Sequence, residues 1–226
     1  MANKNEDLVE YAKIVRIPTA NSCKGFSTDI KLPSSFTFGP SGGFINFYVG
    51  FDDYECGIST ASGQSGWRWF ANSGAVDGTD AGSSFGDFAN GQSVNIRLES
   101  IPDPAGSSNY KVAFFVNNVR KHVFSPLYKA ATTFTGGRIV LAAGQQTWPL
   151  SQVPATLPTW YIAHNQVTTS NTQYKNVNGT WVTLNASNST PATAHTPSNR
   201  THPRPVDYVV SNASFSSGYY YASLNK

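Results

Sequence analysis

Two acidic residues in one short stretch of this sequence have the spacing of a catalytic pair. Asp53 and Glu55 lie two positions apart, and on a β-strand this spacing places both carboxylates on one face, about 7 Å apart. One carboxyl group that gives a proton and one that accepts it can cleave a glycosidic bond. The pair predicts, as one hypothesis, a hydrolase or lyase acting on polysaccharide. The alternative is two solvated acids at a strand end.

Aromatic, amide and guanidinium side chains in the same region indicate a second chemistry, the binding of sugars without catalysis. The rings would stack on sugar rings, while the amides and the guanidinium would bond hydroxyl groups or the carboxylate of a uronate. The candidate ligand-binding residues are Asn46, Tyr48, Trp67, Trp69, Asn95 and Arg97. The alternative for the aromatic rings is packing in the core, where most such rings lie.

Metal chemistry has weaker support in the sequence. The loop from 75 to 91 contains Asp77, Asp80 and Asp87, and clustered carboxylates are the ligands that calcium prefers. Their spacing matches no EF-hand loop, and Asp-Gly is also a common turn pair. The four histidines have no spacing typical of zinc. We expect no metal and no cofactor.

The two cysteines, Cys23 and Cys56, form a possible disulfide. A bond between them would close a loop of about 34 residues and stabilise the fold by roughly 3–4 kcal/mol. Two free thiols are the alternative, and an even number of cysteines does not decide between them.

The elements that carry these residues are predicted to be strands. Segment 44–51 alternates with Ile45, Phe47, Val49 and Phe51 on one face. Segments 93–100, 110–116 and 119–124 predict a meander, and Asn178-Gly179 predicts a hairpin turn. Further strands are expected at 11–17, 26–32, 54–60, 66–71, 137–144, 159–168, 172–184 and 206–221. A capped helical turn is expected at 5–10, and a loop at 185–205.

Composition limits the classes of protein. The chain has 226 residues, 39% of them hydrophobic and 13% charged, which fits a single β-sandwich domain over 1–226. The net charge is +3, but the basic residues form no run, so nucleic acid is not an expected partner. No segment is apolar over the length of a membrane span, so no membrane partner is expected. We expect a monomer.

The expected compartment is extracellular. The low charge and the abundance of Ser, Thr, Asn and Gly favour an exported protein. The N-terminal residues contain no apolar run typical of a signal peptide. Together with the composition, this favours a secreted, mature form whose leader has been removed. Residence in the cytoplasm is the alternative.

The order of strands and turns resembles a known superfamily. The segments SVNIRLES, YKVAFFVNNVRKHVF and GRIVLAAG are similar to the concanavalin A-like jelly-roll, which includes lectins, laminarinase-type glucanases, alginate lyases and glutamic peptidases. The segments YECGIST and WRWF also resemble a secreted family of Gram-positive bacilli. The glucanase motif E-x-D-x-x-E is absent.

The glutamic peptidases resemble the chain around 49–52, where VGFD stands for their V-G-I-D, and around 67–70. The catalytic Gln and Glu of that family have no counterpart, since Gln64 lies in an expected turn and GRIVLAAG has no Glu. The resemblance implies a two-sheet antiparallel β-sandwich. We therefore expect a lectin-like sandwich that binds polysaccharide or glycan, with a polysaccharide-active enzyme and a structural or interaction protein as alternatives.

Overall fold

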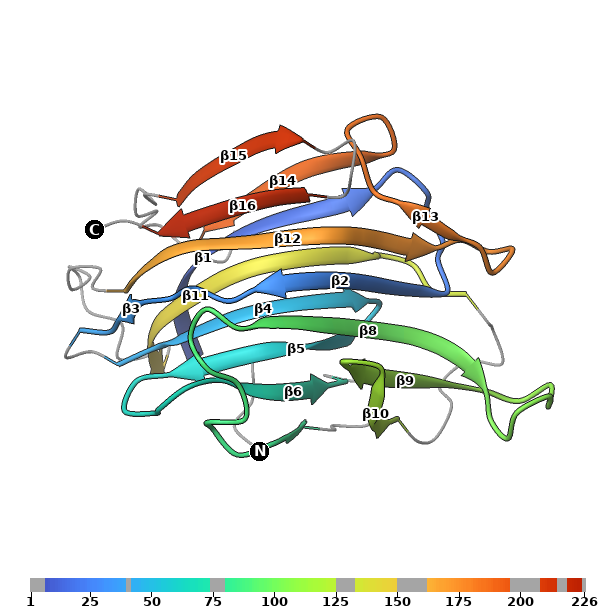
Figure 1. Cartoon of the computed structure of the whole chain (residues 1–226), viewed down its shortest axis with the longest axis horizontal. Coiled ribbons are helices and arrows are strands. Elements are labelled where there is room, and N and C mark those ends of the chain that lie inside the picture. Colours follow the sequence, from blue (N-terminus) through green and yellow to red (C-terminus); the bar gives the residue numbers. More distant parts are fainter. Residues whose placement is uncertain are drawn as a thin grey trace.

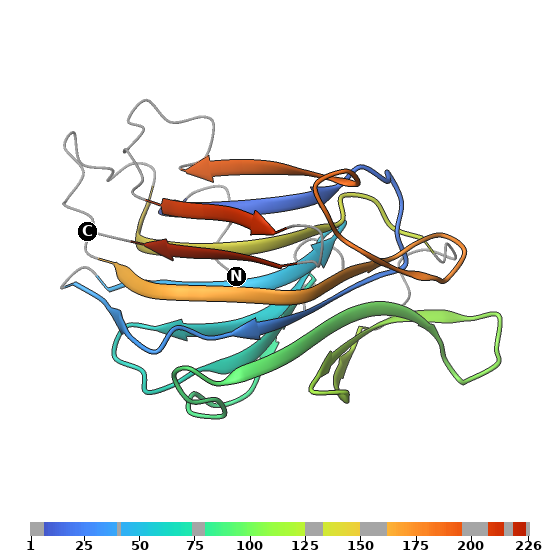
Figure 2. The ribbon, with the colours of Figure 1, turned by 45° about the horizontal axis from the view of Figure 1, so that its top comes forward.

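The computed structural model describes residues 7–39, 42–73, 80–124, 133–149, 162–195, 208–214 and 219–224. These residues form two stacked antiparallel sheets (Figures 1 and 2). The strand axes of one sheet are broadly aligned with those of the other. This arrangement confirms the predicted all-β sandwich with a jelly-roll-like pattern. No helix that could cross a membrane occurs among the described residues.

One sheet has seven strands. Its strands, in spatial order, are β14 (Ser189–His195), β1 (Asp7–Pro18), β11 (Arg138–Pro149), β4 (Phe44–Phe51), β5 (Tyr54–Ala61), β6 (Arg68–Asn72) and β7 (Asp80–Gly82).

The other sheet has nine strands. The main path is β10 (Val119–Val123), β9 (Tyr110–Val116), β8 (Ser93–Pro102), β2 (Gly25–Lys31), β12 (Ala163–Lys175), β16 (Tyr219–Leu224) and β15 (Tyr208–Ser214). Two short strands, β13 (Trp181–Thr183) and β3 (Phe36–Thr37), also pair with β12.

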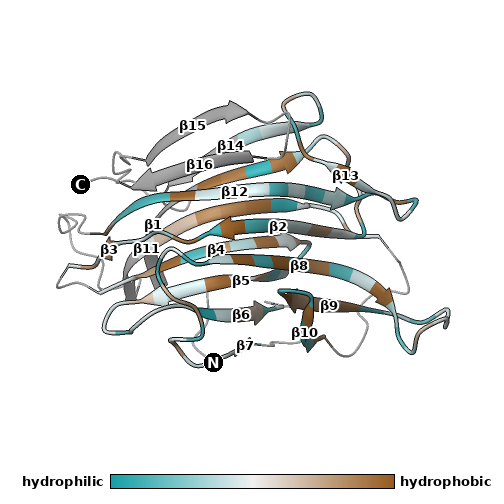
Figure 3. Cartoon of the chain, in the orientation of Figure 1, coloured by the Kyte–Doolittle hydropathy of each residue, from teal (hydrophilic) through white to brown (hydrophobic). Residues whose placement is uncertain are grey.

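The core lies between the sheets and follows the predicted alternation. In β4, Ile45, Phe47, Val49 and Phe51 are completely buried. They face the inward side chains of the other sheet, where β2 and β8 alternate between hydrophobic and hydrophilic residues (Figure 3). A period of two residues therefore decides which side of each strand is inside.

The predicted meander is confirmed, because β8 pairs with β9 and β9 pairs with β10. The hairpin turn at Asn178-Gly179 is also confirmed, between β12 and β13. The two strands predicted at 159–168 and 172–184 differ, since β12 runs unbroken from Ala163 to Lys175. A bulge with a positive φ of 52° at Asn171 lets the strand continue where the polar residues indicated a break.

Two local predictions are wrong. Residues 7–10 belong to β1 rather than to a helical turn, because pairing with β11 overrides the local capping pattern. Residues 189–195, expected in a loop, form β14 and pair with β1. Edge strands tolerate proline, as at Pro191, and this segment gives no periodic signal.

Candidate functional site

The six residues predicted to bind one ligand are not brought together by the fold. Asn46 and Tyr48 lie on the outer face of the seven-stranded sheet, whereas Asn95 and Arg97 lie on the outer face of the nine-stranded sheet. The Trp67 ring lies between the sheets, and the Trp69 ring packs against the same core. The sandwich core thus separates the predicted residues into groups on opposite sides.

The expectation that Trp67 stacks on a sugar is wrong. Trp67 is completely buried, and its Nε1 donates a hydrogen bond of 2.9 Å to Asn90 Oδ1. Its ring stacks on Phe47, with centroids 5.4 Å apart. Trp69 is only partly buried, but it too packs against the core, near Phe114. Trp69 and Ala71 share one side of β6, and Trp67, directly before the strand, lies on the same side, so the side that carries the indoles is the buried one.

Tyr48 is also unable to serve as an open stacking surface. It is 8% exposed and belongs to a small hydrophobic cluster with Val15, Val140 and Ala142 on the outer side of the sheet. Burial raises the pKa of its hydroxyl, and the neighbouring Glu55 carboxylate raises that pKa further. Tyr48 therefore remains a neutral phenol. Asn46, two residues before Tyr48 on the same face of β4, is partly exposed.

The predicted acid pair does not form on one strand face. Asp53 is exposed in the turn between β4 and β5, and only Glu55 lies within β5. Glu55 Oε1 lies 3.0 Å from Arg138 Nη2 as an ion pair. Gly50 leaves the space for this guanidinium, because a Cβ there would lie 3.2 Å from Arg138 Cζ. Glu55 is therefore a charge-paired residue, and the acid/base hypothesis loses its geometry.

Strand β11, which contains the segment RIVLAAG, has no acid in that segment either. Alternation along β11 directs Arg138, Val140 and Ala142 to the outer face, where they pair with β4. This stretch of the outer face has an arginine and apolar side chains and no Glu. Among the side chains that the structure describes, the outer face of the seven-stranded sheet thus lacks the expected acid pair.

The cysteines are free thiols. Both Cys23 and Cys56 are buried and unbonded, so the possible disulfide is absent from the structure. Burial raises the pKa of the Cys23 thiol to about 12, and it raises the pKa of Cys56 as well. Both side chains behave as small core residues.

Metal ligands do not cluster in the described part of the chain. No group of three or more His, Cys, Asp or Glu side chains is placed there to hold an ion. Of the three aspartates proposed for calcium, Asp80 and Asp87 are exposed, and Asp77 lies outside the described residues.

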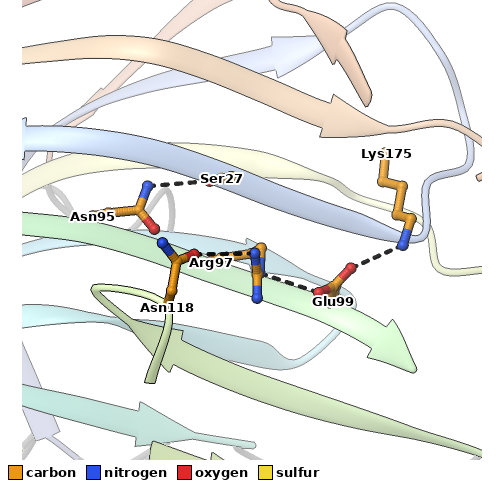
Figure 4. A network of polar contacts seen from close by, with 6 residues as sticks. All are labelled: Ser27, Asn95, Arg97, Glu99, Asn118 and Lys175. Atoms are coloured by element: carbon orange, nitrogen blue, oxygen red, sulfur yellow. Dashed lines mark hydrogen bonds and ion pairs between the residues drawn. The ribbon is translucent and has the colours of Figure 1, made fainter. Parts of the chain in front are cut away.

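Asn95 and Arg97 each belong to a group of polar contacts on the outer face of the nine-stranded sheet (Figure 4). Arg97 Nε lies 3.1 Å from Glu99 Oε1, and Lys175 Nζ lies 2.9 Å from Glu99 Oε2. Arg97 Nη1 donates a hydrogen bond of 3.3 Å to Asn118 Oδ1. One carboxylate thus fixes two cations that come from different strands.

A second group of polar contacts lies beside the first along β8 and includes Asn95. Asn95 Nδ2 donates to Asp29 Oδ1 at 2.8 Å, and Asn171 Nδ2 donates to Asp29 Oδ2 at 2.7 Å. Asn95 Nδ2 also lies 3.4 Å from Ser27 Oγ (Figure 4). These bonds use the amide donors and leave the amide oxygens as acceptors. From Asn95 to Glu99 the row measures about 13 Å along the strand.

Two aromatic rings border these polar contacts. The Arg97 guanidinium lies over Phe115, 4.3 Å from the ring centroid, and Lys175 Nζ lies 5.6 Å from the centroid of Trp181. Both rings are partly exposed. We name this set the Arg97 face: Asn95, Arg97, Glu99, Phe115, Lys175 and Trp181.

Sequence reasoning missed Lys175, Phe115 and Trp181 as members of this face. The signal for Trp181 was present in the hairpin at Asn178-Gly179, whose register places Trp181 opposite Lys175. No local signal brings this hairpin to β8, because β2 must first insert between them.

Comparison with known proteins gives a likeness in structure only. No protein family and no curated protein matches the sequence. The crystal structure of scytalido-glutamic peptidase with a peptide-based transition state analog is similar, with a TM-score of 0.59 and 11% identity over 96% of this chain and 98% of that chain. The shared feature is the fold.

A second similar structure is SCP-B, a member of the eqolisin family of peptidases, in a complex with the tripeptide Ala-Ile-His. Its TM-score is 0.56, with 10% identity over 96% of this chain and 98% of that chain. Both comparisons extend over nearly the whole of each chain, so they concern the complete two-sheet architecture. At such identities the likeness does not carry the activity.

Proposed function

We propose that this chain is a non-catalytic, lectin-like β-sandwich of the concanavalin A-like type that binds a glycan on the Arg97 face. The observation that carries the proposal is the polar row from Asn95 to Glu99, bordered by the partly exposed rings of Phe115 and Trp181. Sugar recognition needs an aromatic surface for the apolar side of the ring and fixed polar groups for the hydroxyls. Both are present within one sheet face.

The rigidity of the polar groups supports binding. Glu99 is 8% exposed and holds Arg97 and Lys175, and Asp29 holds Asn95. Groups that are fixed before the ligand arrives lose less conformational entropy on binding. A sandwich without the acid/base pair is consistent with binding in place of cleavage.

A peptide is the second candidate ligand, favoured by the similarity in fold to two peptidases whose structures contain a peptide-based analog and a tripeptide.

We further propose, from composition, that the protein is exported from a bacterial cell, where polysaccharide would be available.

A ligand screen with the intact chain tests the proposal. Binding to a panel of soluble polysaccharides and to a peptide mixture is measured by tryptophan fluorescence and calorimetry. Trp181→Ala is expected to weaken glycan binding by about tenfold, since an aromatic contact contributes about 0.5–1.5 kcal/mol beyond the area that it buries.

The chain offers a matched control on the other sheet. Arg68 also lies over a ring, Phe85, with 4.7 Å between Cζ and the ring centroid. Arg97→Gln should weaken binding, whereas Arg68→Gln should leave it unchanged. Equal losses in both variants, or binding of peptides but of no glycan, would overturn the proposal. Release of reducing sugar or of unsaturated product would instead support the alternative hypothesis of a polysaccharide-active enzyme.

A further inference from the structure

Charge is distributed unevenly over the nine-stranded sheet. The strand register directs the cationic side chains of Lys31, Arg97, Lys111, Arg120 and Lys175 to its outer face, and Lys121 is exposed at the bulge in β10. Three acids stand against them, Asp29 and Glu99 in the strands and Asp103 just after β8, which pairs with Lys111. Cationic side chains therefore outnumber acidic ones among the described residues of this face.

The acids of the face are occupied by internal contacts. Glu99 is nearly buried and is shared between Arg97 and Lys175, so one negative charge serves two positive ones. The Asp29 carboxylate accepts hydrogen bonds from Asn95 and Asn171. A second anion could therefore approach the two cations without displacing an exposed carboxylate.

Unused donors remain on both cations. Arginine has five N–H groups; in Arg97 one on Nη1 reaches Asn118 and Nε faces Glu99, and no partner within the described residues takes the other three. Lys175 has three donors, of which one reaches Glu99. The side chains of Arg97 and Lys175 are 26% and 22% exposed, so the donors can reach a ligand.

We infer that the ligand of the Arg97 face is an acidic glycan, a polymer that contains uronic acid. Its carboxylate lies against Arg97 and Lys175, because the Arg97 guanidinium, positioned over the Phe115 ring, has the paired donors that a carboxylate accepts. Its sugar ring lies beside Trp181. This inference rests on the proposed function and adds the chemical class of the ligand.

Neutral and acidic forms of one oligomer separate the two proposals. Binding of a short oligogalacturonate is compared with binding of the same oligomer after its carboxylates are reduced to alcohols. We expect the acidic form to bind at least about tenfold more tightly, since hydrogen bonds to charged groups contribute about 1.5–3 kcal/mol each. Equal affinities would overturn the inference and leave glycan binding intact, whereas no binding of either form or of any panel glycan would overturn both.

Variants identify the side chains that bind the ligand's carboxylate. Arg97→Gln and Lys175→Gln are expected to reduce the preference for the acidic oligomer toward unity. Arg97→Lys should keep only part of the preference, because lysine retains the positive charge but lacks the paired N–H donors of the guanidinium. Circular dichroism and thermal unfolding identify variants that fail to fold. Arg68→Gln, on the opposite sheet, should keep the full preference.

Two other outcomes count against the inference. If the preference survives in both Arg97→Gln and Lys175→Gln, the carboxylate is bound elsewhere. If sedimentation shows that the chain self-associates and that Arg97→Gln dissociates it, the face binds a second copy. A preference that weakens steadily with added salt is expected, because the contacts are partly exposed to solvent.

Discussion

Lys175 Nζ lies 2.9 Å from Glu99 Oε2, although strand β2 runs between the two strands that carry them. The residue of β2 at this level is Gly25, which is paired with Lys175 on one side and with Glu99 on the other. With no side chain at Gly25, the ion pair crosses β2 directly. One polar contact thus connects the C-terminal part of the chain with its middle.

Removing the carboxylate should destabilise the protein more than removing the amine. Glu99→Gln leaves two cations without a counter-charge at a nearly buried position, and we expect a loss of about 1–3 kcal/mol in the free energy of unfolding. Lys175→Gln removes a more exposed partner, so its loss should stay below about 1 kcal/mol. Urea unfolding of both single variants and of the double variant gives the coupling energy; strictly additive losses would contradict the ion pair.

A side chain at Gly25 should be costly. A Cβ there would lie 2.7 Å from Glu99 Cβ and 2.9 Å from the Leu98 carbonyl oxygen. Gly25→Ala therefore forces β2 and β8 apart, and we expect a loss of about 1–3 kcal/mol by urea unfolding. Ser93→Ala, at the exposed start of β8, is the control and should change stability by less than about 0.5 kcal/mol. An unchanged Gly25→Ala midpoint would show that the strands can separate freely.

His164 should make stability depend on pH. Its ring is 3% exposed and meets Phe47 edge to face, with centroids 5.6 Å apart. Burial lowers the pKa of His164 to about 4, while the hydrogen bond with the Asn165 carbonyl partly opposes this shift. The native state keeps the ring neutral, so below the ordinary pKa of about 6.5 only the unfolded chain takes up the proton.

The stability should accordingly be unaffected by this group above pH 6.5 and should fall between pH 6.5 and about 4. The full loss would approach about 3 kcal/mol. His164→Leu should flatten this part of the pH profile, whatever its effect on stability at pH 7. A profile of the same slope in wild type and variant would exclude His164 as the cause.

Both thiols should be present but unreactive in the native protein. Burial and the raised pKa values leave little accessible thiolate at Cys23 or Cys56. Iodoacetamide should modify neither residue over the time in which it modifies both in urea. A thiol titration in denaturant without reductant should find two groups per chain; finding none would show that the two cysteines are bonded after all.

The alternation of side chains in the sequence was sufficient to predict the class of fold and most strands. Segments such as 44–51 and 93–100 repeat with a period of two, which is a local property of strands, and the turn at Asn178-Gly179 follows from its residue types. Alternation also placed Asn95, Arg97 and Glu99 together on the outer side of β8. These features depend only on neighbours in the chain.

Which residues share a surface was decided by the tertiary structure alone. Nothing local to β6 shows that its tryptophan side faces the core, since either side could pack; Phe36 and Phe47, from distant strands, close around Trp67. The pairing of Glu55 with Arg138 and of Glu99 with Lys175 joins residues 83 and 76 positions apart. Such contacts depend on strand order and register, which long-range packing selects, so the sequence determined the strands and only the folded sandwich assembled the Arg97 face.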